Sequence, residues 1–345
     1  MARSHLTLAA LATSAVPGLD LVRTAPFGSG RHGDYDSAIV EDRGGRRLLV
    51  RVPTTKSAED EQSADLVALR TLSTGVRSRL PFRVATWLGE APTGPTRAYV
   101  YEYLAGSPVQ LDDIQPGDGL AASLGRAIAA IHSLPTAFVG DAGLPVLSAA
   151  DAQRAAGATV DRAAGTGLVP SALLQRWETA LGDTSLWQFQ PAVVHGSLQA
   201  TSFLAEGGAV TAVLGWAELR VGDPARDLNW VLGARRPQVA ESVFDAYNAA
   251  RQVTVDRQLR QRALLYAELE IARWLLHGTD RHDRGVIDDA VAMLGGLADS
   301  VGGESGTPLA HQTLPAMDMD QVERMLDSRR KSSESSQSDR RSFSE

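Results

Sequence analysis

Residues 193–204 read VVHGSLQATSFL, and residues 210–228 read VTAVLGWAELRVGDPARDL after a Gly-Gly turn. Apolar residues around Val193 and Val213 predict two short strands, each followed directly by a polar loop. Loops that follow strands often carry catalytic groups. Here, however, the residues directly after the two strands are mostly neutral. The stretch therefore has the layout of a catalytic loop but few groups that could catalyse a reaction.

The composition narrows the class of protein. The chain has 345 residues, 43% of them hydrophobic and 22% charged, which is enough for one or two folded units. A net charge of -7 argues against nucleic acid as a partner, because the phosphate backbone requires a basic face. Cysteine is absent, which excludes disulfides and is compatible with a reducing cytoplasm. Lys56 and Lys331 are the only lysines, so arginine would have to bind any phosphate.

Residues 1–104 predict a small β-rich lobe. Its first 18 residues favour an amphipathic helix over a signal peptide, because the apolar run is short and interrupted by threonines. Alternating apolar residues predict a hairpin over 34–53 and a second one over 85–106. Between the hairpins we expect a helix with Ser57 as its N-cap. No run of about 20 apolar residues is available to span a bilayer.

Residues 105–301 predict a larger helical lobe, which makes the fold class α+β with two lobes. Apolar residues at helical spacing run from Leu120 to Ile131, and helices are also expected over 150–182 and 236–299. Residues 302–345 are rich in serine and charge, so a disordered tail is expected there. The tail would act either as a binding segment for a protein partner or as a solvated terminus.

With both lobes in view, the quoted stretch resembles the aminoglycoside and macrolide phosphotransferases, which have the protein-kinase-like fold. Their catalytic loop reads H-G-D-L-H-x-x-N, and their metal strand reads I-D-W or I-D-F. The segments DYDSAIV, GRRLLVRVP, SRLPF, IHSLP and LLQRWETAL are similar to the macrolide 2'-phosphotransferases in particular. The resemblance covers about residues 33–296. It implies a nucleotide, ATP or GTP, and a small molecule in the cleft between the lobes.

The resemblance also identifies four positions where the chemical groups differ. A kinase of this type needs an Asp to accept the substrate proton and a second Asp to hold magnesium. Those two positions are Ser197 and Gly215. The position of the second metal ligand is Ser202, and Gln199 occupies the position of the intervening His or Tyr. Magnesium binding is therefore doubtful, and the sequence predicts no intact catalytic residue.

The nucleotide-binding residues implied by the resemblance lie mostly in the first lobe. Gly28, Gly30 and Gly33 have the spacing of a phosphate-binding loop and directly precede a strand. The phosphate-contacting cation would be an arginine, its acidic partner an aspartate, and the base would meet backbone groups of the connection between the lobes. These positions are Arg51, Asp65, Glu102 and Leu104.

Two interpretations of the cleft follow. In the first, the protein is a pseudoenzyme that keeps the fold for ligand binding or regulation, with His195 and Asp227 organising the loop. In the second, it is an active ATP- or GTP-dependent small-molecule phosphotransferase, and Glu218 or Asp223 binds the metal. A third, scaffold-like interpretation assigns interactions to the tail alone.

Overall fold

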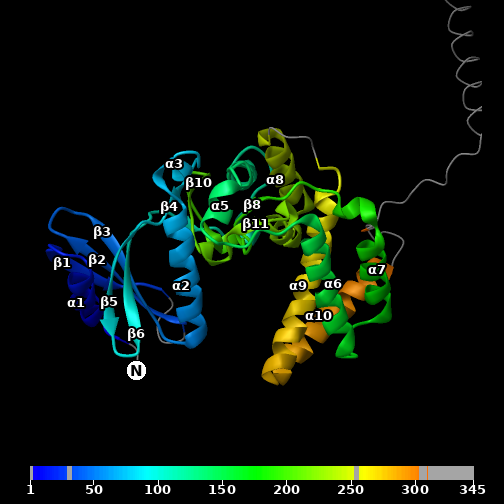
Figure 1. Ribbon diagram of the computed structural model, residues 1–345, viewed down its shortest axis with the longest axis horizontal. Helices are drawn as coiled ribbons and strands as arrows, with labels where there is room; N and C mark the ends of the chain where they lie inside the picture. Colours follow the sequence, from blue (N-terminus) through cyan, green and yellow to red (C-terminus); the bar gives the residue numbers. More distant parts are fainter. Residues whose placement is uncertain (1–2, 29–32, 252–255, 303–308, 310–345) are drawn as a thin grey trace, which may run out of the picture. The chain divides into compact units, whose positions relative to one another are not determined.

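The computed structural model describes residues 3–28, 33–251, 256–302 and 309. Its first part is a five-stranded antiparallel sheet in the order β1-β2-β3-β6-β5 (Figure 1). The strands are β1 (Leu21–Pro26), β2 (Tyr35–Asp42), β3 (Arg47–Pro53), β5 (Trp87–Thr93) and β6 (Thr96–Glu102). Both predicted hairpins are confirmed.

One helix packs on each face of this sheet. The N-terminal helix α1 (His5–Ala15) forms a small core with inward-facing residues such as Val50 and Val100. Alternate strand residues, including Tyr101, belong to the larger core that includes α2 (Lys56–Thr71). The sheet is thus covered on both faces, and α2 links it to the rest of the molecule.

The predicted N-cap of α2 is wrong. The helix begins at Lys56, and the side chain of Thr55 accepts the hydrogen bond from the backbone N–H of Ala58. Thr55 has the extended backbone that an N-cap requires, whereas Ser57 is already inside the first turn.

The second part is mainly helical, as predicted. Its longest helix, α9, packs against α6 and α10, and α4 packs against α8. These helices are α4 (Leu120–His132), α6 (Ala149–Gly165), α8 (Pro237–Ala250), α9 (Leu259–Arg281) and α10 (Arg284–Gly302), with the shorter α5 (Ala137–Asp141) and α7 (Ser171–Gly182). The four-residue helix α3 (Thr74–Arg77) follows α2 in the first part. In the described ranges, no helix combines the length and apolar character needed to cross a membrane.

Short strands position the quoted loops. β8 (Ala192–Val194) pairs with β11 (Arg220–Gly222), and β9 (Phe203–Glu206) pairs with β10 (Ala209–Val213). The last two belong to a four-stranded sheet completed by β4 (Arg83–Val84) and β7 (Ser107–Pro108). The two predicted strands are therefore confirmed, and the loops after β8 and β10 lie close together. The predicted disordered tail lies outside the described residues, except for Gly302 and Leu309.

Candidate functional site

A cavity of about 340 Å³ lies between the five-stranded sheet and the loops of the helical part. We call it the sheet cavity. Both parts of the chain line it, and its walls are mostly aromatic and aliphatic side chains. Of the residues singled out in the sequence, it brings together Arg51, Asp65, Glu102, Leu104 and Gly215. Five positions that the resemblance places around a nucleotide thus share one cavity.

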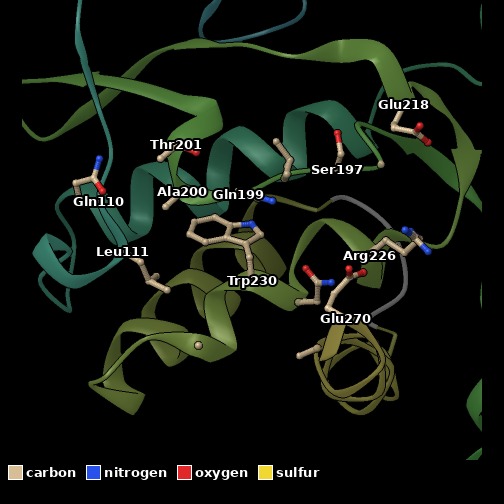
Figure 2. Close-up of a pocket in the computed structure, with 15 residues that line it drawn as sticks. Gln110, Leu111, Ser197, Gln199, Ala200, Thr201, Glu218, Arg226, Trp230 and Glu270 are labelled. Atoms are coloured by element: carbon tan, nitrogen blue, oxygen red, sulfur yellow. The ribbon is translucent and has the colours of Figure 1, made fainter. Parts of the chain in front are cut away.

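A second cavity of about 820 Å³, the loop cavity, lies below the loop that follows β8. Figure 2 shows Ser197 and Gln199 on one side of it and Trp230 and Glu270 on the other. Glu218 and Arg226 lie at one end. The size is within the usual range for a pocket that encloses a small molecule.

Asp227 organises the loop after β8. Its two carboxylate oxygens accept hydrogen bonds from the backbone N–H groups of His195 and Gly196, at 2.7 and 2.8 Å. The ring of His132 contacts it at 3.1 Å. Burial acts to raise the pKa of Asp227, but the hydrogen bond and charge of His132 outweigh burial and hold this pKa below its usual value. The loop is therefore fixed by a buried, ionised carboxylate.

The His195 ring contributes to the same loop and lines neither of the two cavities. Its Nε2 lies 3.0 Å from the backbone oxygen of Leu214, and the side chain is wholly buried against Trp216. Burial lowers the pKa of His195, so the ring is neutral and donates to that oxygen. These contacts connect the loop after β8 to the loop after β10.

The described residues offer no carboxylates at the positions of the two expected aspartates. Ser197 is exposed in the loop cavity, and Gly215 has left-handed backbone angles. The hydroxyl of Ser202 accepts a hydrogen bond from the N–H of Gln199 and so closes the loop on itself. Within the described ranges, no three His, Cys, Asp or Glu side chains are grouped so that they could hold a metal ion.

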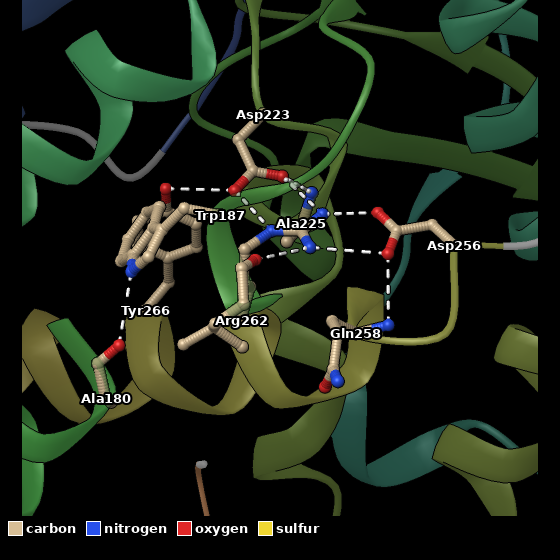
Figure 3. A network of polar contacts seen from close by, with 9 residues as sticks. Ala180, Trp187, Asp223, Ala225, Asp256, Gln258, Arg262 and Tyr266 are labelled. Carbon is tan, nitrogen blue, oxygen red and sulfur yellow. Dashed lines mark hydrogen bonds and ion pairs between the residues drawn. The ribbon is translucent and has the colours of Figure 1, made fainter. Parts of the chain in front are cut away.

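Asp223 is not available as a metal ligand, which corrects one of the two expectations for metal binding. Figure 3 shows its carboxylate against the guanidinium of Arg262, whose other side meets Asp256. Asp223 also accepts hydrogen bonds from Tyr266 Oη at 3.1 Å and from the N–H of Ala225 at 2.9 Å. Because this carboxylate is fully buried and its oxygens accept hydrogen bonds from Arg262, Tyr266 and Ala225, it has no free oxygen for a metal ion.

Glu218 remains exposed at the edge of the loop cavity, and its carboxylate forms an ion pair with Arg220. With 55% of its side chain accessible, it is the carboxylate nearest in sequence to Gly215 on the cavity wall. It has one acidic group to offer, where the phosphotransferase chemistry needs two.

Arg51 and Asp65 both line the sheet cavity, but they do not form the expected ion pair. The guanidinium of Arg51 stacks on the ring of Tyr35, with its central carbon 3.8 Å from the ring centroid. Asp65 instead accepts a hydrogen bond from the backbone N–H of Trp216 at 2.7 Å. Burial raises the pKa of Asp65 to about 6, although the Trp216 N–H and the charge of Arg51 act to lower it.

The connection between the two parts retains a free backbone donor. The N–H of Tyr103 donates to Arg47 at 3.1 Å, whereas the N–H of Leu104 donates to no other residue of the described ranges. The side chain of Glu102 pairs with Arg83. Gly28 has φ 93° and Gly33 accepts from Thr54, but the expected phosphate-loop residue Gly30 lies outside the described residues.

Sequence reasoning missed two residues of these cavities. Gln62 is buried in the sheet cavity and hydrogen-bonded to the hydroxyl of Tyr101, and its amide oxygen has no partner. Arg226 lines the loop cavity without an acidic partner among the described residues. The helical spacing of Gln62 to Asp65 was a usable signal for the first, whereas nothing in the VGDPARDL segment distinguishes Arg226 from a surface arginine.

A β-rich part and a helical part that enclose a ligand-sized cavity, with a histidine-headed loop beside it, define a kinase-like phosphotransferase fold. Residues 25–266 match the phosphotransferase enzyme family, and the chain belongs to this family.

Solved structures agree with the fold. Macrolide 2'-phosphotransferase MphH from Brachybacterium faecium, an apoenzyme, is 23% identical with a TM-score of 0.70, over 84% of this chain and 98% of that one. Macrolide 2'-phosphotransferase type I is 25% identical with a TM-score of 0.67, over 85% and 98%. The GDP complex of aminoglycoside 2'-phosphotransferase-IIIa is 15% identical with a TM-score of 0.69, over 86% and 99%.

A curated relative, the uncharacterized protein YcbJ of Bacillus subtilis (strain 168), is 26% identical over 208 residues. The match covers 56% of this chain and 65% of YcbJ, so the chain spans about two thirds of its relative's length.

Proposed function

We propose that this protein binds a nucleotide or a nucleotide-like small molecule in the sheet cavity and has given up phosphoryl transfer. The observation that carries the proposal is the pair Ser197 and Gly215, which replaces both carboxylates of the chemistry within an otherwise organised site.

The absence of a general base alone should strongly lower the rate of phosphoryl transfer. Ser197 is exposed and neutral, so it can donate a hydrogen bond to an acceptor but cannot take up the proton of a substrate hydroxyl. Removing a positioned general base typically lowers the rate by a factor of about 10² to 10⁴. The absence of a metal ligand at Gly215 adds a separate electrostatic penalty on the transferred group.

Binding needs fewer groups than catalysis, and those groups remain. The sheet cavity offers apolar walls such as Leu204, the guanidinium of Arg51, and the N–H of Leu104, which has no partner in the described ranges. Backbone donors and apolar walls suit a planar base, and a guanidinium can bind phosphate oxygens. The GDP and ADP complexes of related phosphotransferases support a nucleotide as this ligand.

The test is to restore both carboxylates with Ser197→Asp and Gly215→Asp together. A Cβ atom added at Gly215 meets nothing within 4 Å, and aspartate tolerates left-handed backbone angles better than most residues. Ser197 is exposed, so its replacement also fits. We expect no magnesium-dependent phosphorylation or nucleotide hydrolysis by the natural protein, and a gain of at least tenfold over background in the double variant.

Two outcomes would refute the proposal. The first is magnesium-dependent phosphoryl transfer by the natural protein at a rate typical of the family. The second is the absence of any nucleotide binding, measured by calorimetry with ATP, GTP and their diphosphates, with and without magnesium.

The alternative is an active small-molecule phosphotransferase that uses Glu218. Its exposed carboxylate lines the loop cavity and lies three positions after Gly215, which favours it over the buried Asp223. A magnesium-dependent activity that is lost in Glu218→Gln and kept in Glu206→Gln would establish this alternative. Glu206 is a suitable control because it is exposed at the end of β9 and absent from the cavity lining.

A further inference from the structure

Arg226 is a charged group without a matching charge. It lines the loop cavity, and it forms no ion pair within 4 Å with any residue that the structure describes. Its Nε is buried and has no hydrogen-bond partner there. The nearest compensation is the ring of Tyr266, whose centroid is 5.5 Å from the guanidinium carbon. A guanidinium has five N–H donors, and leaving a buried donor unsatisfied is costly.

Two further arginines increase the positive charge around Arg226. Burial lowers the pKa of Arg220 and of Arg273, and the charge of Arg226 lowers both further. Each of them already has its own acidic partner, Glu218 for Arg220 and Glu270 for Arg273. The two pairs are neutral overall, so the charge of Arg226 is in excess.

Asp227 is the remaining carboxylate that acts on this cluster. It attracts Arg220, but its oxygens are occupied by the N–H groups of His195 and Gly196 and by His132. Its side chain is fully buried behind the loop. It therefore offers no free acceptor to Arg226 on the side of the cavity.

The residue at position 197, a serine, explains why the excess positive charge of Arg226 can be useful. It lines the same cavity as Arg226, and an aspartate at this position would bring a negative charge into that cavity (Figure 2). Serine brings a neutral hydroxyl, which donates a hydrogen bond instead of repelling an anion. Serine at position 197 thus removes the general base and also makes the cavity more favourable for an anion.

We infer that the loop cavity is an oxyanion site, which binds the phosphate or carboxylate group of a small molecule between the guanidinium of Arg226 and the hydroxyl of Ser197. Guanidinium groups bind both anions by paired N–H donors, and the bond is strengthened by the charge. The volume of about 820 Å³ leaves space for the rest of the molecule beside the anion. This inference concerns a cavity other than the proposed nucleotide site and does not depend on it.

The full chain is titrated with inorganic phosphate at constant ionic strength set by chloride, and binding is followed by calorimetry and by the thermal midpoint. We expect a saturable response. Arg226→Gln should weaken the apparent affinity at least tenfold, whereas Arg235→Gln should leave it unchanged. Arg235 is an exposed arginine, paired with Asp112, outside the cavity lining.

Ser197→Asp supplies a second readout that keeps Arg226 and its contact with Tyr266 in place. It should weaken phosphate binding at least tenfold, because its carboxylate competes for the guanidinium and repels the ligand. Ser197→Asn, which is neutral, should keep most of the affinity. Parallel titrations with glycerol phosphate and with succinate identify whether the natural ligand carries phosphate or carboxylate, and saturable binding of either supports the site.

A response to phosphate that equals that to chloride overturns the inference. So does a saturable response that is the same in Arg226→Gln, Ser197→Asp and the natural protein, because the anion would then bind elsewhere. Neither result bears on nucleotide binding in the sheet cavity, which is measured separately.

Discussion

The carboxylate of Asp65 in α2 accepts a hydrogen bond of 2.7 Å from the backbone N–H of Trp216, the first residue after Gly215. The bond joins the helix of the β-rich part to the loop in which a metal-binding aspartate is missing. Asp65 therefore holds the backbone of the loop, where the resemblance expected it to hold the side chain of Arg51.

This bond predicts a pH-dependent stability. Burial raises the pKa of Asp65 from 3.8 to about 6, so the folded state binds a proton more tightly than the unfolded state. Burying the carboxyl group of Asp65 costs least when the group is protonated. The free energy of unfolding should therefore fall by roughly 1 to 3 kcal/mol as the pH rises from about 4 to about 6. Urea unfolding at pH 4.5 to 7.5 measures this loss.

The matched variant is Asp65→Asn, which keeps an oxygen for the N–H of Trp216 and cannot ionise. The difference in unfolding free energy between the variant and the natural protein should shift in favour of the variant as the pH rises. A difference that stays constant from pH 4.5 to 7.5 would mean that Asp65 does not titrate in this range. Contributions from other groups, such as Asp227, cancel in the comparison.

Alanine substitutions at Gly196 and Gly215 distinguish the effect of a steric clash from that of backbone strain. Gly196 has φ 90°, and a Cβ atom there would lie 2.4 Å from the backbone oxygen of Glu218. Gly215 has φ 79° and open space around it. Gly196→Ala should lower the free energy of unfolding by about 2 to 4 kcal/mol, from strain and clash together, and Gly215→Ala by about 1 to 2 kcal/mol, from strain alone.

Chemical denaturation of both variants measures the difference. Equal losses would show that the chain around Gly196 moves away from the backbone oxygen of Glu218 at little cost. Calorimetry with a nucleotide on Gly215→Ala adds a second check, because Gly215 lines the sheet cavity and an added Cβ atom meets nothing within 4 Å.

Most of the fold could be predicted from local patterns in the sequence. The β2–β3 hairpin was predictable because its turn, Gly44-Gly45, lies between two alternating apolar runs of the same segment. The absence of carboxylates at positions 197 and 215 could also be read directly. The N-cap of α2 was misassigned because Thr55 and Ser57 are both good caps two residues apart, and only the backbone angles separate them.

The candidate site was harder to predict because its contacts join distant residues. Asp65 and Trp216 are 151 positions apart, and Asp223 and Arg262 are 39 apart. No spacing rule connects such pairs. An acidic residue close to the metal strand therefore looked available in the sequence, although its charge is already matched by a buried arginine from α9.

The loop after β8 should depend on Asp227. Asp227→Ala removes the acceptor of the His195 and Gly196 N–H groups and leaves them buried without a partner. At about 1 to 3 kcal/mol for each unsatisfied group, we expect a loss of roughly 2 to 5 kcal/mol and faster hydrogen exchange at these two amides. Asp112→Ala is the control, because its carboxylate pairs with an exposed arginine. Unchanged exchange at His195 and Gly196 would contradict this role.

The buried pair of Asp223 and Arg262 supplies a test of structure against metal binding. Arg262 donates to Asp223 at 2.8 and 3.1 Å and to the backbone oxygen of Leu186 at 3.0 Å, and the side chains of the pair are fully buried (Figure 3). Arg262→Met leaves Asp223 charged and unpaired, so we expect a loss of about 3 to 5 kcal/mol. Arg260→Met, an exposed position on the same helix, should cost about 0.5 kcal/mol or less.

The same variants decide whether Asp223 binds magnesium. If Asp223 only forms the ion pair, the loss of stability in Arg262→Met is the same with and without magnesium, and so is the loss in Asp223→Asn. Neither substitution then removes a metal ligand. Thermal unfolding at zero and at saturating magnesium measures both. The contrary outcome is that magnesium stabilises the natural protein and Arg260→Met but not Asp223→Asn. That result would show that Asp223 binds magnesium, because a residue that only pairs with Arg262 cannot produce this pattern.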